Sequence, residues 1–266
     1  MLLSIQHSTT YRYSAPVRYA LQQLRMTPKD RAGQRVRQWQ LQVNGGTKQL
    51  AFNDQHANHV DLVSVASGAQ EIALICQGMV ETEDRAGIVG AHAGHLPLWY
   101  FTGDTSLTRA GRLVRALAKA VGGEGDAVGR LHALSAMVRD TIGYAPGHTH
   151  AETTAEQALA LGSGVCQDHA HSFCAAARLL GIPARYVSGY LLMDDRTQQD
   201  ATHGWAEAHV GGLGWIGFDI SNGICPDERY VRVATGLDYR EAAPVTGMHF
   251  GGGGEEMLVT LAVQQQ

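Results

Sequence analysis

The stretch of sequence that decides the fold reads Leu161-Gly162-Ser163-Gly164-Val165-Cys166-Gln167-Asp168-His169-Ala170-His171. Its glycines predict a flexible turn, and Ser163 is the expected cap of the helix that follows. Apolar residues recur at helical spacing from Ala170 onward, until Gly181 and Pro183 stop the helix. Cys166 is therefore predicted at or beside the first helical turn, where the helix dipole and unpaired N–H groups favour a thiolate. Because the thiolate is the nucleophilic form of cysteine, this position suits a nucleophile.

Two predicted strands downstream carry the partners that such a nucleophile needs. Residues 202–210 form an expected strand with His203 near its start, and residues 213–219 form a second strand that ends in Asp219. The chain thus contains a thiol, an imidazole and a carboxylate in the order of a nucleophile, its base and the group that orients the base. The alternative is that Cys166 is a small buried core residue, as most free cysteines are. The helix position alone supports both interpretations equally. The presence of His203 and Asp219 downstream favours the nucleophile.

The connection between these strands decides whether His203 and Asp219 share a face of the sheet. Directly opposite residues of an antiparallel pair lie on the same face, so these two side chains can face each other only across an odd-length connection. Val210-Gly211-Gly212 is one such three-residue turn, in which Gly211 and Gly212 would adopt positive φ. A two-residue turn would send the side chains to opposite faces.

These segments together resemble the bacterial transglutaminase-like family, whose members are often described as candidate cysteine proteases. The resemblance rests on Gly164-Val165-Cys166-Gln167-Asp168, on Gly181-Ile182-Pro183-Ala184-Arg185-Tyr186-Val187-Ser188-Gly189-Tyr190, on His203-Gly204-Trp205 and on Gly214-Trp215 through Asp219. Nearer the N-terminus, Tyr11-Arg12-Tyr13 and Leu24-Arg25-Met26-Thr27-Pro28 resemble the β-rich domain that precedes the catalytic core in this family. The resemblance therefore covers essentially the whole chain.

The resemblance implies an α+β fold. A β-sandwich-like N-terminal domain would precede a papain-like or transglutaminase-like core, with the cysteine on a helix and the histidine and aspartate on an antiparallel sheet. The papain-like catalytic roles then fall on Cys166, His203 and Asp219. The chain departs from the family pattern twice, with His203-Gly204-Trp205 for His-Ala-Trp and Asp219-Ile220-Ser221 for Asp-Pro-Thr. Because proline fixes φ, its loss is expected to loosen the backbone after Asp219.

The activity expected from these residues is acyl transfer on amide bonds through a thioester. Cys166 would attack the carbonyl carbon, with its own backbone N–H as an oxyanion donor, and His203 would carry the proton to the leaving amine. Hydrolysis by a peptidase or amidase is the favoured outcome, and a protein or peptide is the expected substrate. Glutamine cross-linking by a γ-glutamyltransferase and a catalytically idle binding module are the alternatives. Asp168, Trp205 and Tyr190 are expected beside the cleft.

The chain divides into four predicted parts. These are an N-terminal β-rich domain over residues 1–85, a linker over 86–103, the catalytic core over 104–250, and a glycine-rich link with a C-terminal strand over 251–266. Short alternating segments separated by turn residues predict a sandwich in the first part. The alternating pattern of the last part predicts a strand but leaves open which sheet it joins.

Helices are expected in the core over residues 107–121, 127–142 and 155–161. Gly122-Gly123 would close the first of them. Thr153, followed three residues later by Glu156, predicts the cap of the third. A strand over residues 185–192 would place Tyr186 and Tyr190 on one side of the sheet.

Composition narrows the functional class. The 266 residues carry a formal net charge of −4, which provides no basic face for nucleic acid. The N-terminus lacks the basic and long apolar regions of a signal peptide, and no apolar run predicts a membrane partner. The four cysteines follow no disulfide or metal-binding framework, so the simplest expectation is a reduced, cytoplasmic protein without a cofactor. Oligomeric state is left open.

A metal site is the third alternative for the central stretch. His169 and His171 stand two residues apart, and side chains at this spacing diverge on a helix. Two further histidine pairs stand at residues 56 and 59 and at residues 92 and 95. No cysteine or acidic residue accompanies either pair at the spacing of a metal site. The sequence therefore predicts no metal ligands.

Overall fold

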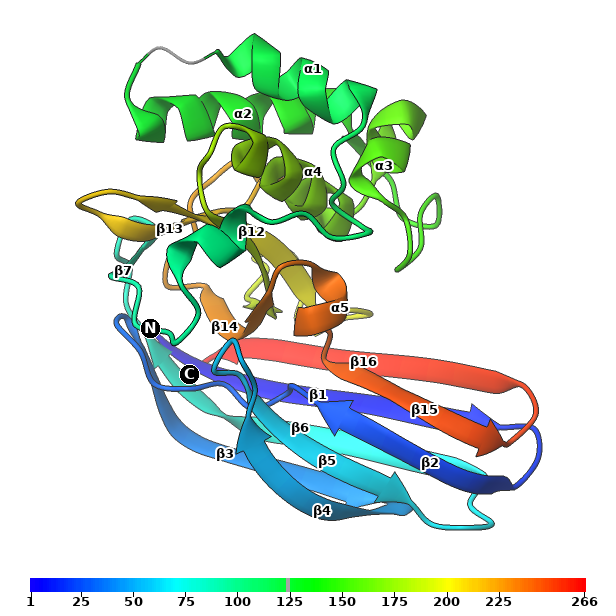
Figure 1. The fold of residues 1–266 in the computed structure, drawn as a ribbon. Helices are drawn as coiled ribbons and strands as arrows, with labels where there is room; N and C mark the ends of the chain where they lie inside the picture. The colour runs from blue at the N-terminus through cyan, green and yellow to red at the C-terminus, as the bar shows by residue number, and fades with distance from the viewer. Residues whose placement is uncertain (123–124) are drawn as a thin grey trace.

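The computed structural model describes residues 1–122 and 125–266, which form a β-sandwich, a second sheet above it and a layer of helices on top (Figure 1). One sheet of the sandwich contains, in spatial order, β11 (Gln198–Gln199), β16 (Glu255–Gln265), β1 (Leu2–Tyr13), β6 (Glu71–Thr82) and β3 (Gln34–Asn44). The other contains β15 (Val245–Gly251), β2 (Val17–Leu24), β5 (His59–Val65) and β4 (Gly46–Asn53). The predicted N-terminal sandwich is therefore confirmed.

The sandwich holds together because its strands alternate in burial. Along β1 every second residue is buried, and the inward side chains of both sheets pack into one cluster that includes Tyr11, Val17, Leu24, Val63 and Leu74. Alternation of this kind places one face of each sheet in the core and the other face in solvent.

The C-terminal strands complete the sandwich. β16 pairs antiparallel with β1 along its whole length, from Leu3 opposite Gln265 to Tyr13 opposite Glu255, and β15 pairs with β2. Positive φ at Gly251, Gly252 and Gly253 turns the chain between the two strands. The final strand thus joins the N-terminal sheets, and β15 lies there too, although the core was expected to reach residue 250. We therefore propose a β unit of residues 1–85 and 245–266 around a core that ends near residue 244.

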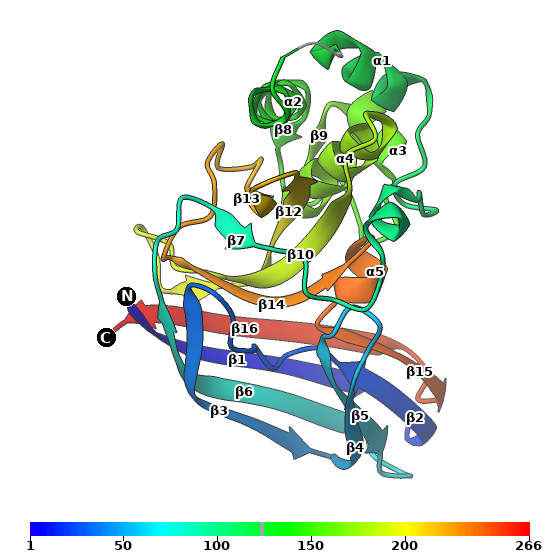
Figure 2. The ribbon, with the colours of Figure 1, turned by 60° about the vertical axis from the view of Figure 1, so that its left-hand side comes forward.

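The core sheet lies between the sandwich and the helices (Figure 2). It contains, in spatial order, β14 (Tyr230–Gly236), β10 (Ala184–Leu191), β12 (His203–Val210), β13 (Gly214–Phe218) and β7 (Ile88–Gly90), and its pairs are antiparallel. Part of the predicted linker therefore forms the sheet edge, and the rest contains the 3₁₀ helix η1 (Leu98–Thr102).

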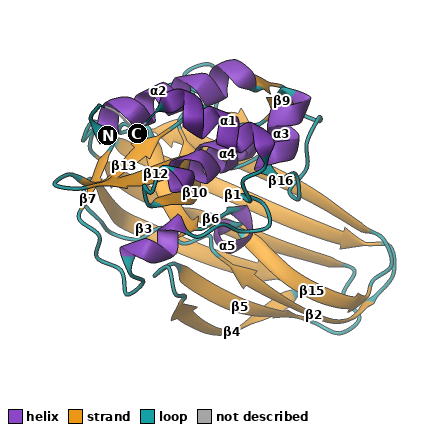
Figure 3. Cartoon of the chain, turned by 45° about the horizontal axis from the view of Figure 1, so that its top comes forward, coloured by secondary structure: helices purple, strands orange, loops and turns teal. Residues whose placement is uncertain are grey.

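The helices gather on the side of the core sheet away from the sandwich (Figure 3). They are α1 (Arg112–Val121), α2 (Ala127–Thr141), α3 (Ala155–Leu161) and α4 (Cys166–Leu179), with the short α5 (Tyr239–Ala242) beside β14. Helix α4 is central, since its buried Phe173, Cys174 and Ala177 join Ala206 and Phe218 of the sheet in one core. A helix buried on this scale is anchored by packing rather than by propensity.

Two helix starts differ from their predictions for one reason. Thr154 and Gln157, not Thr153 and Glu156, form the capping box of α3. Glu156 instead caps α1, where its carboxylate accepts hydrogen bonds from the N–H groups of Leu113 (2.8 Å) and Val114 (3.1 Å). Because this cap comes from another helix, α1 begins at Arg112 rather than at residue 107.

The sandwich and the core sheet meet along β14. The side-chain amide of Gln34 binds the backbone of Arg232 in both directions (2.8 and 3.0 Å), and Asn58 does the same to Thr235 (2.8 and 2.7 Å). Two amide side chains therefore satisfy an edge strand as a further strand would.

The described helices include none that is both long and apolar enough to cross a membrane. Gly122 ends α1 with φ of +76°, while Gly123, the other half of the predicted stop, lies outside the described residues.

Candidate active site

The thiol of Cys166 stands on the first residue of α4, as predicted from the sequence. The cap is Asp168 rather than Ser163, because Oδ2 of Asp168 accepts the N–H of Val165 at 2.8 Å. Gly164 lies so close that a Cβ on it would stand 2.6 Å from that oxygen. The motif Gly164-Val165-Cys166-Gln167-Asp168 is therefore a compact helix start that leaves the cysteine half-buried at the helix N-terminus.

Short strands hold this turn against the rest of the core. β9 (Ser163–Gly164) pairs parallel with β8 (Gly143–Tyr144), and Oδ2 of Asp168 also accepts the hydroxyl of Thr149 at 2.7 Å. The other carboxylate oxygen of Asp168 is buried without a partner among the described residues. Asp168 thus fixes the loop before the cysteine and does not itself reach the imidazole.

His203 and Asp219 form a buried ion pair. Nε2 of His203 donates to Oδ2 of Asp219 at 2.6 Å, and the two residues are 8% and 0% exposed. His203 begins β12, and Asp219 directly follows β13. The bond occupies Nε2 of His203, and Nδ1 is the ring nitrogen that it leaves available.

The hairpin that carries this pair has a connection of odd length, as predicted, but the register of its two strands differs from the predicted one. Val210 pairs with Gly214, so the three-residue connection is 211–213 rather than 210–212. Gly212 and Gly214 have φ of +84° and +83°, and Gly211 does not take a positive φ. The pairing ends at Ala206 opposite Phe218, which leaves His203 and Asp219 diagonal to each other instead of directly opposite.

Asp219 binds more than the imidazole. Its Oδ2 accepts the hydroxyl of Tyr230 and the side-chain amide of Asn222, both at 2.7 Å, and its Oδ1 accepts the backbone N–H of Asn222 at 3.2 Å. Burial alone would raise the pKa of Asp219, but His203, Tyr230 and Asn222 outweigh burial and lower it. Asp219 is therefore held as a carboxylate inside the protein.

The electrostatics connect the thiol to the imidazole. Burial would lower the pKa of His203, but the negative charge and hydrogen bond of Cys166, together with Asp219, raise it to about 10. Burial raises the pKa of Cys76 to about 12 and that of Cys174 to about 11, and it also raises the pKa of Cys225. Cys166 thus differs from the three other thiols in having an imidazolium beside it.

Aromatic rings pack beside the imidazole of His203. Trp205 stacks on His203, with ring centroids 6.1 Å apart and planes at 28°, and Tyr230 meets Trp205 edge-on at 5.5 Å. Both rings are buried. Their packing restricts the imidazole to the orientation that faces Asp219.

The glycine in His203-Gly204-Trp205 has a local cause. A Cβ on Gly204 would stand 2.1 Å from the hydroxyl oxygen of Tyr186, which lies on the face of the sheet that packs on α4. The ring of Tyr186 is buried and its hydroxyl forms no hydrogen bond with the described residues. Burial and the charge of Cys166 both raise the pKa of Tyr186 well above its usual value. A phenol therefore fills the place of the alanine methyl.

The segment after Asp219 is held firmly without a proline. The N–H of Asp219 binds the carbonyl of Ile224 at 2.8 Å, and its own carbonyl accepts the N–H groups of Gly223 (2.8 Å) and Ile224 (3.2 Å). Ile220 is buried, and the Ser221 hydroxyl bonds to Nδ1 of His169 at 2.7 Å. The expected loosening is thus offset by these hydrogen bonds.

One residue expected beside the cleft lies elsewhere. Tyr190 was expected beside the cleft, but a bulge between Ser188 and Gly189 turns it toward the sandwich, where its hydroxyl meets Nδ1 of His7 at 3.1 Å. His169 donates to the carbonyl of Ile142 at 2.8 Å, and the paired His171 accepts the N–H of Tyr239 at 3.0 Å. These two imidazoles therefore serve different elements.

Sequence reasoning missed three residues of this site: Tyr186, Asn222 and Tyr230. Asn222 carries a weak signal, since a side-chain amide three residues after an aspartate suits a turn. Tyr186 and Tyr230 carry none, because their contacts to Gly204 and Asp219 depend on the order of strands in the sheet.

Comparison with known proteins places the chain in a family. Residues 115–220 match the transglutaminase-like superfamily, and residues 3–81 match the bacterial transglutaminase-like N-terminal region. The chain belongs to the bacterial transglutaminase-like family. The family resemblance seen in the sequence is thereby confirmed.

Individual relatives of this transglutaminase-like chain match either its whole length or part of it. It is 27% identical over 274 residues to an uncharacterised protein of Mycobacterium leprae, covering 98% of both chains. It is 34% identical over 128 residues to an uncharacterised protein of Mycobacterium bovis, covering 44% of this chain and 41% of the relative. A crystal structure of a candidate cysteine protease from Cytophaga hutchinsonii has a TM-score of 0.79 and 22% identity, covering 100% and 91% of the two chains. That likeness confirms the predicted fold class.

Proposed function

We propose that this protein catalyses acyl transfer on amide bonds through a thioester on Cys166. The observation that carries the proposal is the buried ion pair of His203 and Asp219, with Nε2 and Oδ2 2.6 Å apart, beside a thiol at a helix N-terminus. A helix start and an imidazolium both stabilise a thiolate. These groups supply a nucleophile, a proton carrier and an orienting carboxylate.

The reaction would proceed in two steps. The Cys166 thiolate attacks the amide carbonyl, and the protonated His203 gives its proton to the departing amine, which leaves a thioester. A water molecule, or a primary amine, then attacks the thioester while His203 accepts its proton, and the thiolate leaves. Asp219 keeps the ring oriented and stabilises its positive charge throughout.

The developing oxyanion needs donors that are already in place. The N–H of Cys166 opens α4 and makes no hydrogen bond with the described residues, so we assign it as one donor. We assign the hydroxyl of Tyr186 as the second, since it lies beside Gly204, next to His203, and is likewise unengaged. The sequence offered no second donor.

Hydrolysis is the outcome we favour, with a peptide or protein amide as substrate. The solved structure of the same fold is described as a candidate cysteine protease, which supports testing peptides first. The same three groups serve transamidation equally well, so glutamine cross-linking stays the alternative. We propose a cytoplasmic site of action on the grounds of composition alone.

One experiment separates these outcomes. The protein is incubated with a glutamine-containing peptide, with and without a fluorescent primary amine, and the products are weighed by mass spectrometry. New peptide termini, or glutamate in place of glutamine, identify a hydrolase, whereas amine incorporation identifies a transferase. A covalent adduct on Cys166 with neither product would favour a stalled acyl-enzyme. Absence of both products and adduct, across a peptide library, would favour the idle binding module.

A further inference from the structure

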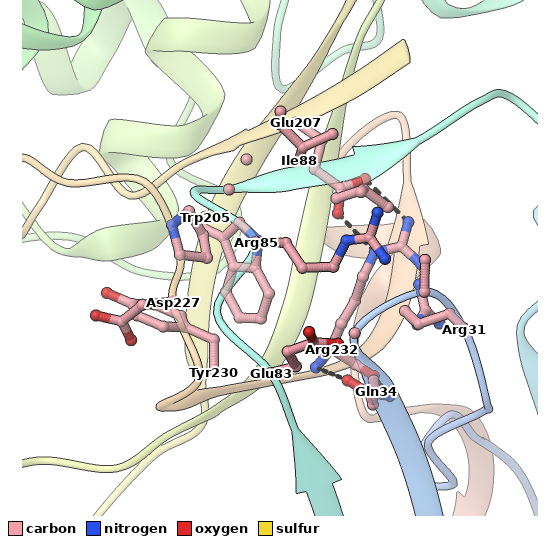
Figure 4. Close-up of a pocket in the computed structure, with 16 residues that line it drawn as sticks. Arg31, Gln34, Glu83, Arg85, Ile88, Trp205, Glu207, Asp227, Tyr230 and Arg232 are labelled. Carbon is pink, nitrogen blue, oxygen red and sulfur yellow. Dashed lines mark hydrogen bonds and ion pairs between the residues drawn. The ribbon is translucent and has the colours of Figure 1, made fainter. Parts of the chain in front are cut away.

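A cavity of about 70 Å³ lies at the seam between the sandwich and the core sheet (Figure 4). Its wall includes Arg31 and Gly33 from the turn before β3, Arg85 from the segment after β6, and Glu207 and Arg232 from the core sheet. None of Cys166, His203 and Asp219 lines it, although Trp205 and Tyr230 do. A space of this size holds a few water molecules or one small ion.

The wall carries three arginines (Arg31, Arg85, Arg232) and three carboxylates (Glu83, Glu207, Asp227), and two further arginines behind it bind two of these carboxylates. The carboxylate of Glu207 is fully buried and is bound by Arg185 at 2.6 Å and by Arg232 at 2.6 and 3.0 Å. Both of its oxygens are therefore occupied by two guanidinium groups. Asp227, on the same wall, is taken by Arg229 at 2.6 Å. With Arg185 and Arg229 counted, five guanidinium groups stand against the three carboxylates Glu83, Glu207 and Asp227, so the region has a surplus of cations.

Arg31 adds a third guanidinium near Glu207. Among the described residues its side chain has no ion pair and no hydrogen bond, and its Nε atom is buried without a partner. Burial lowers the pKa of Arg31 to about 10, against the attraction of Glu207 and with the repulsion of Arg185. Arg31 is half-buried, and a guanidinium that is partly removed from water without a direct hydrogen-bond partner is unfavourable. Something negative in the cavity would relieve that cost.

The turn that carries Arg31 is rigid. Arg31 and Gln34 exchange backbone hydrogen bonds at 2.9 and 3.1 Å, and Gly33 between them has φ of +76°. Gln34 is in turn bound to the backbone of Arg232, so the turn is tied to the core sheet. Arg85 packs over Gly33, where a Cβ would stand 2.7 Å from its Cδ atom. Figure 4 shows the arginine side chains gathered around Glu207.

We propose that this cavity is a binding site for a small oxyanion, a carboxylate or a phosphate group, held by Arg31 with Arg85 at its rim. The planar guanidinium fork matches both kinds of group, and charge-assisted hydrogen bonds of this type are the strong ones. The bound anion would link the turn of the sandwich to the core sheet. It would therefore stabilise the two units against separation, next to Trp205 and Tyr230 of the proposed active site.

Thermal unfolding of the full chain tests this site. The midpoint Tm is measured at pH 7 with sodium phosphate or sodium acetate, each against sodium chloride of equal ionic strength. We expect a saturable rise of about 3–6 °C at ten times the Kd. A rise with phosphate alone assigns a phosphate group, and a rise with acetate alone assigns a carboxylate.

Variants decide whether the rise comes from this cavity. Arg31→Met keeps an unbranched apolar stem and removes the charge, so the anion-dependent rise should disappear, whatever the baseline Tm. Arg35→Met removes an exposed charge nearby on β3 and should keep the rise. If Arg31→Met fails to fold, Arg31→Lys serves, because it keeps the charge without the fork and should weaken binding at least tenfold. An equal rise in wild type and the Arg31 variant, or no rise beyond chloride, overturns the proposal.

Discussion

Tyr230 and His203 share a single oxygen of Asp219, the hydroxyl at 2.7 Å and the ring nitrogen at 2.6 Å. The tyrosine therefore competes with the imidazole for the same lone pairs while it helps to keep the carboxylate charged. A hydrogen bond to a charged group contributes about 1.5–3 kcal/mol. Tyr230→Phe should then lower kcat roughly 10- to 100-fold, with little change in KM.

The matched control for this substitution is Tyr190→Phe, which removes a buried hydroxyl that binds His7 instead of Asp219. It should leave kcat near the wild-type value. Asp219→Asn should be more severe, with a loss on the order of 10²–10⁴ in kcat, because the amide can no longer favour the required tautomer. Equal kcat in wild type and Asp219→Asn would remove the aspartate from the mechanism.

Cys166→Ala should abolish turnover and leave the circular dichroism spectrum and Tm close to those of wild type. Its thiol is half-buried at a helix start, so truncation removes little packing. The Cys225→Ala variant should keep its activity. The Cys76→Ala and Cys174→Ala variants should also stay active at temperatures below their Tm, which is expected to be lower because both thiols are buried. Turnover of any accepted substrate by Cys166→Ala would refute the thiol mechanism.

The coupling of thiol and imidazole predicts an unusual reaction with iodoacetamide. The pKa of His203 is raised to about 10, so its imidazolium persists through neutral pH beside Cys166. Alkylation of Cys166 should therefore stay fast well below pH of about 8.5, where a free thiol loses its reactivity. His203→Ala should shift the rate profile upward in pH.

Site-resolved mass spectrometry provides the rates, and Cys76 and Cys174 are internal references because burial raises the pKa of both. Superimposable profiles for wild type and His203→Ala, each with an ordinary thiol midpoint, would show that the two groups are uncoupled. The idle binding module would then be the better interpretation.

The contact of Gly204 with Tyr186 offers a test of the oxyanion assignment. Tyr186→Phe removes only the proposed donor and should lower kcat roughly 10- to 100-fold at unchanged KM, while the rate of Cys166 alkylation stays as in wild type. A purely structural role would instead change Tm and alkylation together. Loss of activity in Cys166→Ala but not in Tyr186→Phe would keep the proposed function and discard this donor.

Gly204→Ala complements that variant, because the new methyl would stand 2.1 Å from the Tyr186 hydroxyl and 2.8 Å from the ring carbon that bears it. The substitution should lower Tm by several degrees. Adding Tyr186→Phe removes the closer contact and should recover part of the Tm without recovering kcat. Recovery of kcat in the double variant would show that the hydroxyl is dispensable.

Buried neutral histidines predict sensitivity to acid. Burial lowers the pKa of His7 from 6.5 to about 4 and that of His171 from 6.5 to about 3. Between pH 6.5 and these lowered pKa values, the unfolded chain binds more protons than the folded one. The free energy of unfolding is therefore full above pH 6.5 and falls as the pH drops toward 4. His7 alone should account for about 3 kcal/mol of that loss, at 1.36 kcal/mol per unit of pKa.

Urea unfolding at a series of pH values measures this effect. His7→Gln can still bind the hydroxyls of Tyr190 and Thr9 but does not titrate, so its stability should fall less between pH 6.5 and 4. His148→Gln, at an exposed position, should leave the profile unchanged. Parallel profiles for wild type and His7→Gln would contradict the assignment to His7.

Much of the site followed from local patterns. The helix start at Cys166, the strands around His203 and Asp219, and the odd length of their connection are properties of short segments, whose periodicity and turn residues act over a few neighbours. The exact turn was wrong by one residue because 210–212 and 211–213 have the same parity. The predicted cap of α3 was wrong because Thr153 and Thr154 are adjacent, as are Glu156 and Gln157, so two capping pairs have the same spacing. Only packing against α1 decides that Glu156 caps that helix instead.

The sequence by itself determined the helix start at Cys166, the strands that carry His203 and precede Asp219, and the alternation that makes a sandwich. Tertiary structure alone decided that β16 pairs with β1, that Tyr230 reaches Asp219, that Tyr186 takes the space above Gly204 and that three arginines surround Glu207. Any strand edge presents equivalent N–H and C=O groups, so alternation states that a segment is a strand but not which strand it joins. Contacts between residues far apart in the chain follow only from that choice.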